Sequence, residues 1–160
     1  MVTAGATGPE RQEVQIACFR VGEGLYALDI MRIREIIRPQ KLTSIPKMPR
    51  FIEGVIHLRG AVIPVSDLRK RFDQQNREVT GKNRIIICAV GERIVGLLVD
   101  EVLEVRRYAR QDLAPAPQFF KGPEAAFILG VARRGEDLVM IIDLDRILSI
   151  DEQVALGRLE

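Results

Sequence analysis

The two halves of the chain repeat each other, and this repeat limits the possible folds more than any other feature. Moving residues 16–46 forward by 69 positions, or residues 51–72 forward by 76, places glycines, prolines and an Asp-Leu pair on counterparts in the same order. The change in shift indicates an insertion near residues 118–126. The aligned pairs include Ile16 and Ile85, Gly22 and Gly91, Glu35 and Glu104, Pro46 and Pro115, Gly54 and Gly130, and Asp67 and Asp143.

We therefore predict one small β module, duplicated over residues 14–72 and 83–148 and packed against its own copy. Each copy is too short to close a large core alone, which predicts a shared core and a seam where a partner could bind. Residues 1–12 are small and polar, so we expect a disordered tail before a folded domain at residues 13–150, and a second tail at residues 151–160.

Short apolar stretches separated by Gly, Pro and Asn predict a mainly β fold with few short helices. Residues 14–30 and 85–99 each indicate a hairpin. Helical turns are predicted to open at Ser66 and Asp143, and Asp67 and Asp143 are interpreted as structural capping residues. The other predicted strands cover residues 34–38, 51–58, 61–65, 102–107, 128–132 and 138–142.

Charge and cysteine content exclude several classes of protein. Twenty-four basic and 22 acidic side chains leave a net charge of +2, too even for a dedicated nucleic-acid or membrane-surface binder. There is no signal-peptide pattern, and no apolar run reaches the roughly 18 residues of a membrane span. Cys18 and Cys88 lie in apolar runs and are not equivalent in the repeat, so we expect no disulfide, no metal site and a reducing cytoplasm.

The sequence carries no enzyme signature, so we expect no catalytic residue, no cofactor and no metal. His57 is the only histidine, and strand alternation directs it to solvent or a sheet edge. Neighbouring carboxylates such as Asp100 and Glu101 point to opposite faces of a strand, which is poor geometry for a catalytic pair. No nucleophile motif or phosphate-binding loop occurs.

The basic runs have two interpretations. Residues 69–71 and the pair Arg106 and Arg107 fit solvated edge charge that prevents unwanted sheet pairing. They also fit a small barrel that binds single-stranded nucleic acid, although the chain has no Trp and few aromatic residues for base stacking. A nucleic-acid-binding barrel is therefore the alternative from another class of function.

Arg59 precedes Gly60 at a turn between two predicted apolar strands. Such an arginine is usually a polar loop residue, but a fixed hairpin can aim its guanidinium at a carboxylate or carbonyl of another protein. The shift of 76 places Arg59 opposite Gly135, so the arginine belongs to one copy alone.

The segments around Arg59 resemble the CheW family of bacterial chemotaxis coupling proteins. The resemblance covers residues 14–148, and LRG-x-x-x-P-x-x-DL is its most specific part. It implies two SH3-like or OB-like five-stranded β-barrels with exchanged strands and a hydrophobic seam between them. The similar segments are DIMRIREI at 29–36, FIEGVIHLRGAVIPVSDL at 51–68, VGERIVGLLVDEV at 90–102, LAPAP at 113–117 and the closing MIIDLDRIL.

The resemblance also implies an adaptor without catalysis. Proteins of this family join the cytoplasmic tip of methyl-accepting receptors, a long helical hairpin, to the C-terminal regulatory domain of the histidine kinase CheA. The expected location is the cytoplasm, at membrane receptor arrays. Similar adaptors serve chemosensory pathways that control pili or surface growth, which is a second alternative.

Carried over by motif position, Arg59 is the polar residue expected to couple receptor and kinase. Ile33, Glu35, Ile36 and Ile85 are expected at the receptor-facing groove, although each isoleucine fits an ordinary core position equally well. The sequence departs from the family pattern at His57, where many members carry Asn, and in residues 118–126. Three glycines are expected to be structural, at turns or close contacts: Gly54, Gly60 and Gly96.

Overall fold

The computed structural model describes residues 13–48, 50–72, 79–115 and 126–147. The expected tails at residues 1–12 and 151–160, and nearly all of the insertion at 118–126, lie outside these ranges. Within them the chain forms eleven strands, two short α-helices and two 3-10 helices. The strands are β1 (Glu13–Val21), β2 (Gly24–Asp29), β3 (Ile33–Ile37), β4 (Ile52–Leu58), β5 (Ala61–Asp67), β6 (Arg84–Val90), β7 (Arg93–Val99), β8 (Glu101–Ala109), β9 (Leu113–Ala114), β10 (Ile128–Arg134) and β11 (Asp137–Ile142). The helices are η2 (Ile30–Arg32), α1 (Leu68–Arg71), η3 (Arg110–Asp112) and α2 (Leu144–Ile147).

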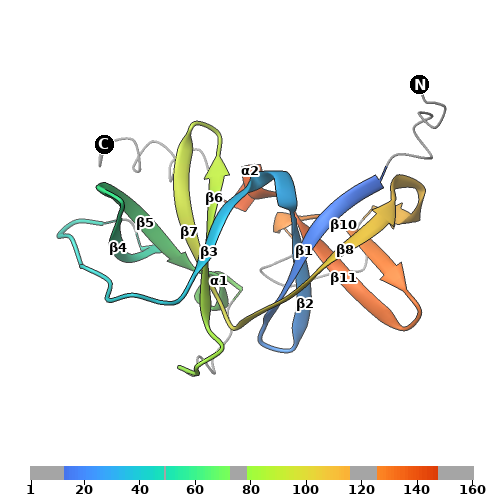
Figure 1. The fold of residues 1–160 in the computed structure, drawn as a ribbon, viewed down its shortest axis with the longest axis horizontal. Helices are drawn as coiled ribbons and strands as arrows, with labels where there is room; N and C mark the ends of the chain where they lie inside the picture. Colours follow the sequence, from blue (N-terminus) through green and yellow to red (C-terminus); the bar gives the residue numbers. More distant parts are fainter. Residues whose placement is uncertain (1–12, 49, 73–78, 116–125, 148–160) are drawn as a thin grey trace.

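The strands form two sheets, which Figure 1 shows side by side. Barrel A is the sheet with the strand order β8-β1-β2-β11-β10-β9, and barrel B is the sheet with the order β3-β6-β7-β5-β4. The repeat aligns β1 to β5 with β6, β7, β8, β10 and β11. Each barrel therefore combines the first hairpin of one copy with the last three strands of the other. The predicted β fold with exchanged strands is confirmed, and barrel A gains the two-residue strand β9 at its edge.

The exchange closes each barrel through a parallel pair of strands. β2 runs parallel to β11, with Tyr26 opposite Met140, and β7 runs parallel to β5, with Gly96 opposite Val65. Parallel neighbours cannot be joined by a tight turn. Here the two partners come from different copies of the repeat, so ladder hydrogen bonds hold the hairpin of one copy to the other.

Hydrophobic side chains form three clusters. The largest, which we call the seam core, lies between the barrels and joins residues such as Phe19 and Leu28 of barrel A to Ile86 and Leu97 of barrel B. A second cluster lies inside barrel A and a third lies inside barrel B. Because each copy contributes strands to both barrels, all three clusters contain residues from both copies. The shared core expected from the repeat is present.

The predicted structural residues have local roles that the geometry explains. The Oδ1 atom of Asp67 accepts a hydrogen bond from the backbone N–H of Arg69 at 2.9 Å and so caps α1, whereas Ser66, predicted to open this turn, lies inside β5. Asp143 accepts from the N–H of Asp145 at 3.0 Å. A Cβ atom at Gly54 would lie 2.9 Å from Cβ of Leu42, and one at Gly96 would lie 2.8 Å from Cγ2 of Ile85.

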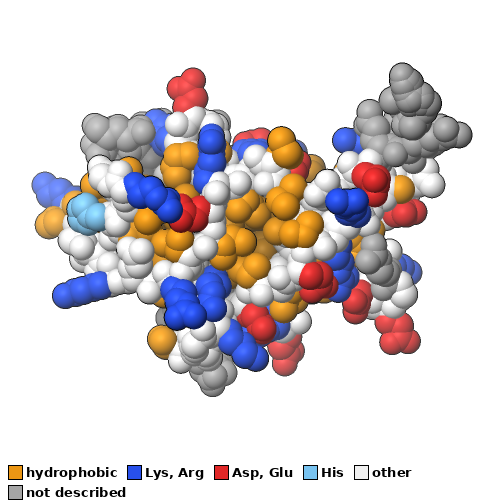
Figure 2. All heavy atoms as spheres, in the orientation of Figure 1, with side chains coloured by type: hydrophobic (Ala, Val, Ile, Leu, Met, Phe, Trp, Pro, Cys, Tyr) orange, Lys and Arg blue, Asp and Glu red, His pale blue; other side chains and the backbone are white. Residues whose placement is uncertain are grey.

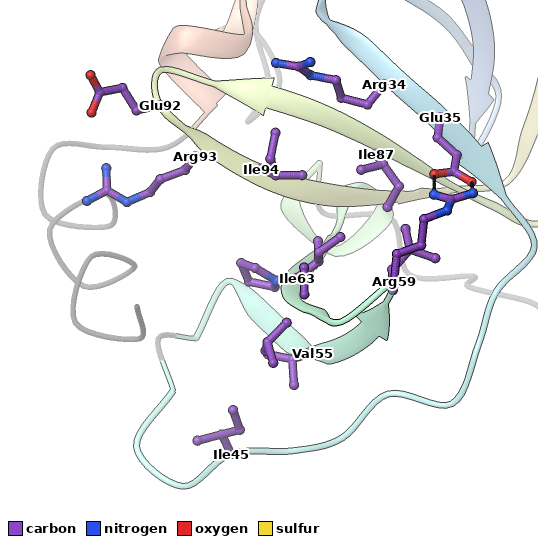
Figure 3. A pocket seen from close by; sticks show the side chains of 14 residues that line it. Arg34, Glu35, Ile45, Val55, Arg59, Ile63, Ile87, Glu92, Arg93 and Ile94 are labelled. Atoms are coloured by element: carbon purple, nitrogen blue, oxygen red, sulfur yellow. Dashed lines mark hydrogen bonds and ion pairs between the residues drawn. The ribbon is translucent and has the colours of Figure 1, made fainter.

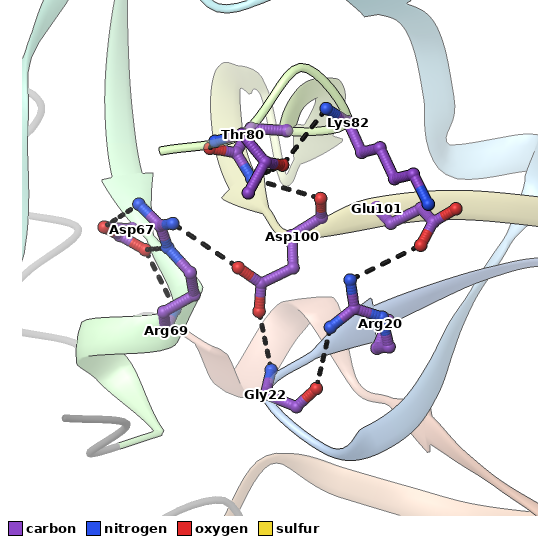
Figure 4. A network of polar contacts seen from close by, with 9 residues as sticks. Arg20, Gly22, Asp67, Arg69, Thr80, Lys82, Asp100 and Glu101 are labelled. Atoms are coloured by element: carbon purple, nitrogen blue, oxygen red, sulfur yellow. Dashed lines mark hydrogen bonds and ion pairs between the residues drawn. The ribbon is translucent and has the colours of Figure 1, made fainter. Parts of the chain in front are cut away.

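A buried ionic network ties the two barrels together (Figure 4). Arg69 lies on α1, which follows β5 of barrel B. Its guanidinium donates to both carboxylate oxygens of Asp67 at 3.0 Å and to Oδ1 of Asp100 at 3.4 Å. Oδ2 of Asp100 in turn accepts from the N–H of Gly22 at 2.6 Å, in the first turn of barrel A. Arg69 is only 5% exposed, so its charge depends on these two carboxylates.

The other junction between the barrels uses the opposite charges. Arg32, between β2 and β3, donates to Oδ1 of Asp145 on α2 at 2.8 Å and to the carbonyl oxygen of Ala89 at 3.0 Å. The shift of 76 places Arg69 on Asp145, so the helix supplies the base at one junction and the acid at the other. Only the helix positions are equivalent, because the shift of 69 places Arg32 on Glu101 and not on Asp100.

Replacing Arg69 with alanine leaves two buried carboxylates without their counter-charge. We expect Arg69→Ala to lower the free energy of unfolding by about 3 to 5 kcal/mol, measured by urea denaturation. Lys70→Ala is the matched control, because the Lys70–Glu53 pair at 2.8 Å is exposed and contributes at most about 1 kcal/mol. Equal losses for the two variants would contradict the role assigned to Arg69.

Candidate functional site

Apolar side chains are exposed at the junction of the two barrels. Figure 2 shows them gathered in the middle of this face, and Figure 1 shows that β3 and β8 run there. Each strand has a bulge near its start, which shifts the alternation of its side chains. We call this surface the seam patch, and it comprises Ile33 and Ile36 of β3 and Val102 and Val105 of β8, which the strand register places on the seam-core face of the two sheets.

Two of the predicted receptor-facing isoleucines belong to the seam patch. Ile33 is half-buried and packs against the seam core, as does Val102, its counterpart in the repeat. Ile36 is 41% exposed, and its counterpart Val105 is 49% exposed. Sequence reasoning missed Val105, although the shift of 69 that aligns the copies points directly to it.

Ile85 does not lie on this surface. It is 1% exposed and packs inside barrel B, where its counterpart Ile16 packs inside barrel A. The expectation that Ile85 faces a partner is wrong, because an inward position on a central strand of the sheet has no access to solvent. The alternative kept for it, an ordinary core residue, is the observed one.

A groove of about 720 Å³ opens at the end of barrel B (Figure 3). Ile87 and Ile94 point into it from the hairpin of β6 and β7, and Ile63 points into it from the hairpin of β4 and β5. We call this groove the mouth of barrel B. Its walls are aliphatic, and Arg34, Glu35, Arg59, Glu92 and Arg93 contribute its charged groups.

Arg59 and Glu35 form a bidentate ion pair at the edge of the mouth. Nη2 of Arg59 donates to Oε1 of Glu35 at 2.8 Å, and Nη1 donates to Oε2. This arrangement lowers the pKa of Glu35, mainly through the hydrogen bonds from the guanidinium, and raises the pKa of Arg59. Both groups are therefore charged at neutral pH, and the pair connects β3 to the turn between β4 and β5.

The backbone at Arg59 adopts a conformation that favours glycine. Its φ angle is 51° and that of Gly60 is 82°, as a two-residue hairpin turn with positive φ at both positions requires. At the equivalent turn of barrel A the first residue is Gly135, with φ of 60°. Residues other than glycine are strained in this region of φ. We infer that the interactions of the Arg59 side chain offset the conformational energy of its backbone.

Barrel A has a corresponding ion pair with the charges reversed. Arg106 of β8 donates to Oε1 of Glu104 at 2.7 Å and to Oδ2 of Asp137 at 3.2 Å, at the start of β11. It also donates to the hydroxyl of Tyr108 at 3.3 Å, and this contact and Glu104 raise the pKa of Arg106. In both barrels an arginine therefore links the third strand of a copy to the last hairpin.

The described residues contain no cluster of three or more side chains that could hold a metal ion. His57 is exposed on β4, while Cys18 and Cys88 are buried, and burial raises the pKa of Cys88 to about 12. No described helix is both long enough and apolar enough to cross a lipid bilayer.

Known proteins share this sequence and this fold. The family described as CheW-like domain matches residues 15–152. Chemotaxis protein CheW of Klebsiella aerogenes is 30% identical, over 95% of this chain and 92% of its own length. Chemotaxis protein CheW of Bacillus subtilis is 35% identical, over 81% of this chain and 83% of its own. Protein FrzA of Myxococcus xanthus is 30% identical, over 92% of this chain and 93% of its own.

The solved structures agree with the sequence relatives. The scaffolding protein TtCheW from Thermoanaerobacter tengcongensis superposes with a TM-score of 0.81 at 35% identity, covering 88% of this chain and 96% of that chain. The family match spans most of the sequence, and the matched region includes both barrels, the seam patch and the mouth of barrel B. The chain therefore belongs to the CheW-like family of chemotaxis scaffold proteins.

Proposed function

We propose that this protein couples methyl-accepting chemotaxis receptors to the histidine kinase CheA in cytoplasmic arrays at the membrane. The observation that carries the proposal is the presence of two separate apolar surfaces, the seam patch and the mouth of barrel B. An adaptor needs two such surfaces, since it must hold two partners at once. Membership of the CheW-like family supports the same conclusion.

The seam patch is the proposed contact for the receptor tip. A helical hairpin binds by laying apolar side chains along a hydrophobic groove. Ile36 and Val105 are exposed on strands that enter the patch from different barrels, so one helix could contact both. Ile33 and Val102 pack against the seam core beneath, so the patch is continuous with that core.

The ion pair of Arg59 and Glu35 is the proposed polar element of coupling. Its arginine is exposed and held by a fixed turn, so its remaining N–H groups can meet a carboxylate or backbone carbonyl of the receptor or kinase. The regulatory domain of CheA, which the family resemblance gives the same fold, is the proposed partner at barrel B. In this account the protein acts through binding geometry and catalyses no reaction.

A charge in the seam patch should prevent receptor binding. We expect Ile36→Asp to reduce co-sedimentation with receptor-bearing membranes by about tenfold or more, because desolvating an aspartate opposes helix docking. Leu138→Asp is the matched control, since Leu138 is 40% exposed on β11 of barrel A and lies outside the patch. Equal losses for Ile36→Asp and Leu138→Asp, or none for either, would remove the seam patch from the proposal.

Removing the guanidinium of Arg59 should weaken receptor–kinase coupling without lowering the stability of the fold. The side chain is 72% exposed and lies outside all three hydrophobic clusters, so we expect Arg59→Ala to leave the melting temperature nearly unchanged. Receptor-dependent control of kinase autophosphorylation should weaken markedly in the same variant. A large fall in melting temperature would instead assign Arg59 a structural role.

A further inference from the structure

The five buried residues of the barrel B cluster all align with buried residues of the barrel A cluster, but barrel A also contains an aromatic side chain that has no counterpart in barrel B. Three walls of the mouth of barrel B, Ile63, Ile87 and Ile94, align with Val139, Cys18 and Leu25 of barrel A. The three barrel A residues pack in one cluster with Tyr108, which is 4% exposed. Barrel A is thus filled at this place by an aromatic ring from its own β8.

Barrel B has no equivalent of that ring. The shift of 69 places Pro39 at the position of Tyr108, and β3 ends at Ile37, two residues earlier. β3 therefore has five residues where β8 has nine. The groove of about 720 Å³ in barrel B is lined by the counterparts of three residues that pack in one cluster with this tyrosine in barrel A.

The polar rim of the mouth also matches the surroundings of Tyr108. In barrel A the hydroxyl of Tyr108 accepts from Arg106, the arginine that links β8 to the start of β11. In barrel B the corresponding link is the ion pair of Arg59 with Glu35, which lines the mouth. Arg59 uses two N–H groups in that pair, and its guanidinium has five. A phenol entering the mouth can therefore find an arginine donor, as Tyr108 does.

The net charge around the mouth indicates which residues should flank such a ring in a partner protein. Between residues 33 and 99 the described part of the chain has twelve Lys and Arg against four Asp and Glu, whereas the rest of it has eight against eleven. Three of the four acids, Glu35, Glu53 and Asp67, are already paired with arginine or lysine. The charge of the whole chain is nearly even, but the basic residues concentrate in barrel B. They appear as the mostly blue left side of Figure 2.

Several of these basic residues lie at the groove itself. Arg34 lines it, and the connection from β3 to β4, which borders it through Ile45, carries Arg38, Lys41 and Lys47. All four are exposed, and none makes an ion pair with another described residue. Their charges are available to an acidic partner.

We propose that the mouth of barrel B binds a tyrosine, or a similar aromatic side chain, that a partner protein presents on a segment flanked by acidic residues. The inference rests on the proposed function in that barrel B contacts a protein partner. The partner segment is extended, because part of β5 has a free edge beside the mouth. β5 pairs with β7 only from Val65 onward, so among the described strands residues 61–64 pair with β4 alone and can accept an added strand on their other side. The mouth has no aromatic residue in its lining, so it offers no platform on which nucleic-acid bases could stack.

A short capped peptide with one central tyrosine between pairs of glutamates tests this inference on the full-length protein. In methyl NMR spectra we expect shifts at Ile63, Ile87 and Ile94, with Ile16 and Ile141 of barrel A unchanged. Replacing the peptide tyrosine with serine should weaken binding about tenfold, because burial of the ring is lost. Replacing its glutamates with lysines should weaken binding at least as much.

Two double variants test the charge requirement. The double variant Arg34→Glu with Lys41→Glu should lower the affinity for the peptide about tenfold. The control, Arg110→Glu with Arg133→Glu at two exposed arginines of barrel A, should leave the affinity unchanged.

Three results would each overturn the inference: equal binding of the tyrosine and serine peptides, shifts confined to the seam patch, or tighter binding of an oligothymidylate than of the peptide. If the peptide fails while receptor membranes and kinase still bind, only this inference falls. If receptor and kinase fail to bind, the proposed function falls whatever the peptide does.

Discussion

The exchange of hairpins between the two copies is the constraint on which the rest of the structure depends. Neither copy can complete a barrel alone, because its first two strands lie in one sheet and its last three in the other. The seam core fills the space that this exchange creates, and the Arg69 network and the Arg32–Asp145 pair fix its two junctions. The exposed seam patch is the surface of this core, so the fold itself generates the proposed receptor site.

The proposed binding features of barrel B lie where equivalent positions of the two copies differ. Arg59 stands where the other copy has Gly135, and Pro39 stands where it has Tyr108. The first difference places an arginine with a positive φ at the edge of a groove, and the second removes the aromatic ring that packs inside barrel A. Two identical copies would present two identical sites, whereas these substitutions make the two barrels differ at equivalent positions.

Much of the fold could be predicted because the repeat, the turn residues and the alternation of apolar residues are local signals. The exchange of strands was implied by the family resemblance and not by these signals, since pairing such as that of β5 with β7 depends on distant residues. Side-chain exposure was harder to predict. Ile36 and Ile85 look alike in sequence, yet one lies at a sheet edge and the other inside a barrel. The mouth of barrel B could not be predicted from local signals, because its walls come from hairpins of both copies of the repeat.

The central claim is that one chain holds receptor and kinase at the same time. The most direct measurement is the fraction of purified kinase that sediments with receptor-bearing membranes as this protein is added. We expect the fraction to rise with added protein and then to fall at excess, when separate molecules of this protein occupy the receptor and the kinase. A fraction that stays the same with and without the protein, although each partner binds it separately, would contradict the adaptor mechanism.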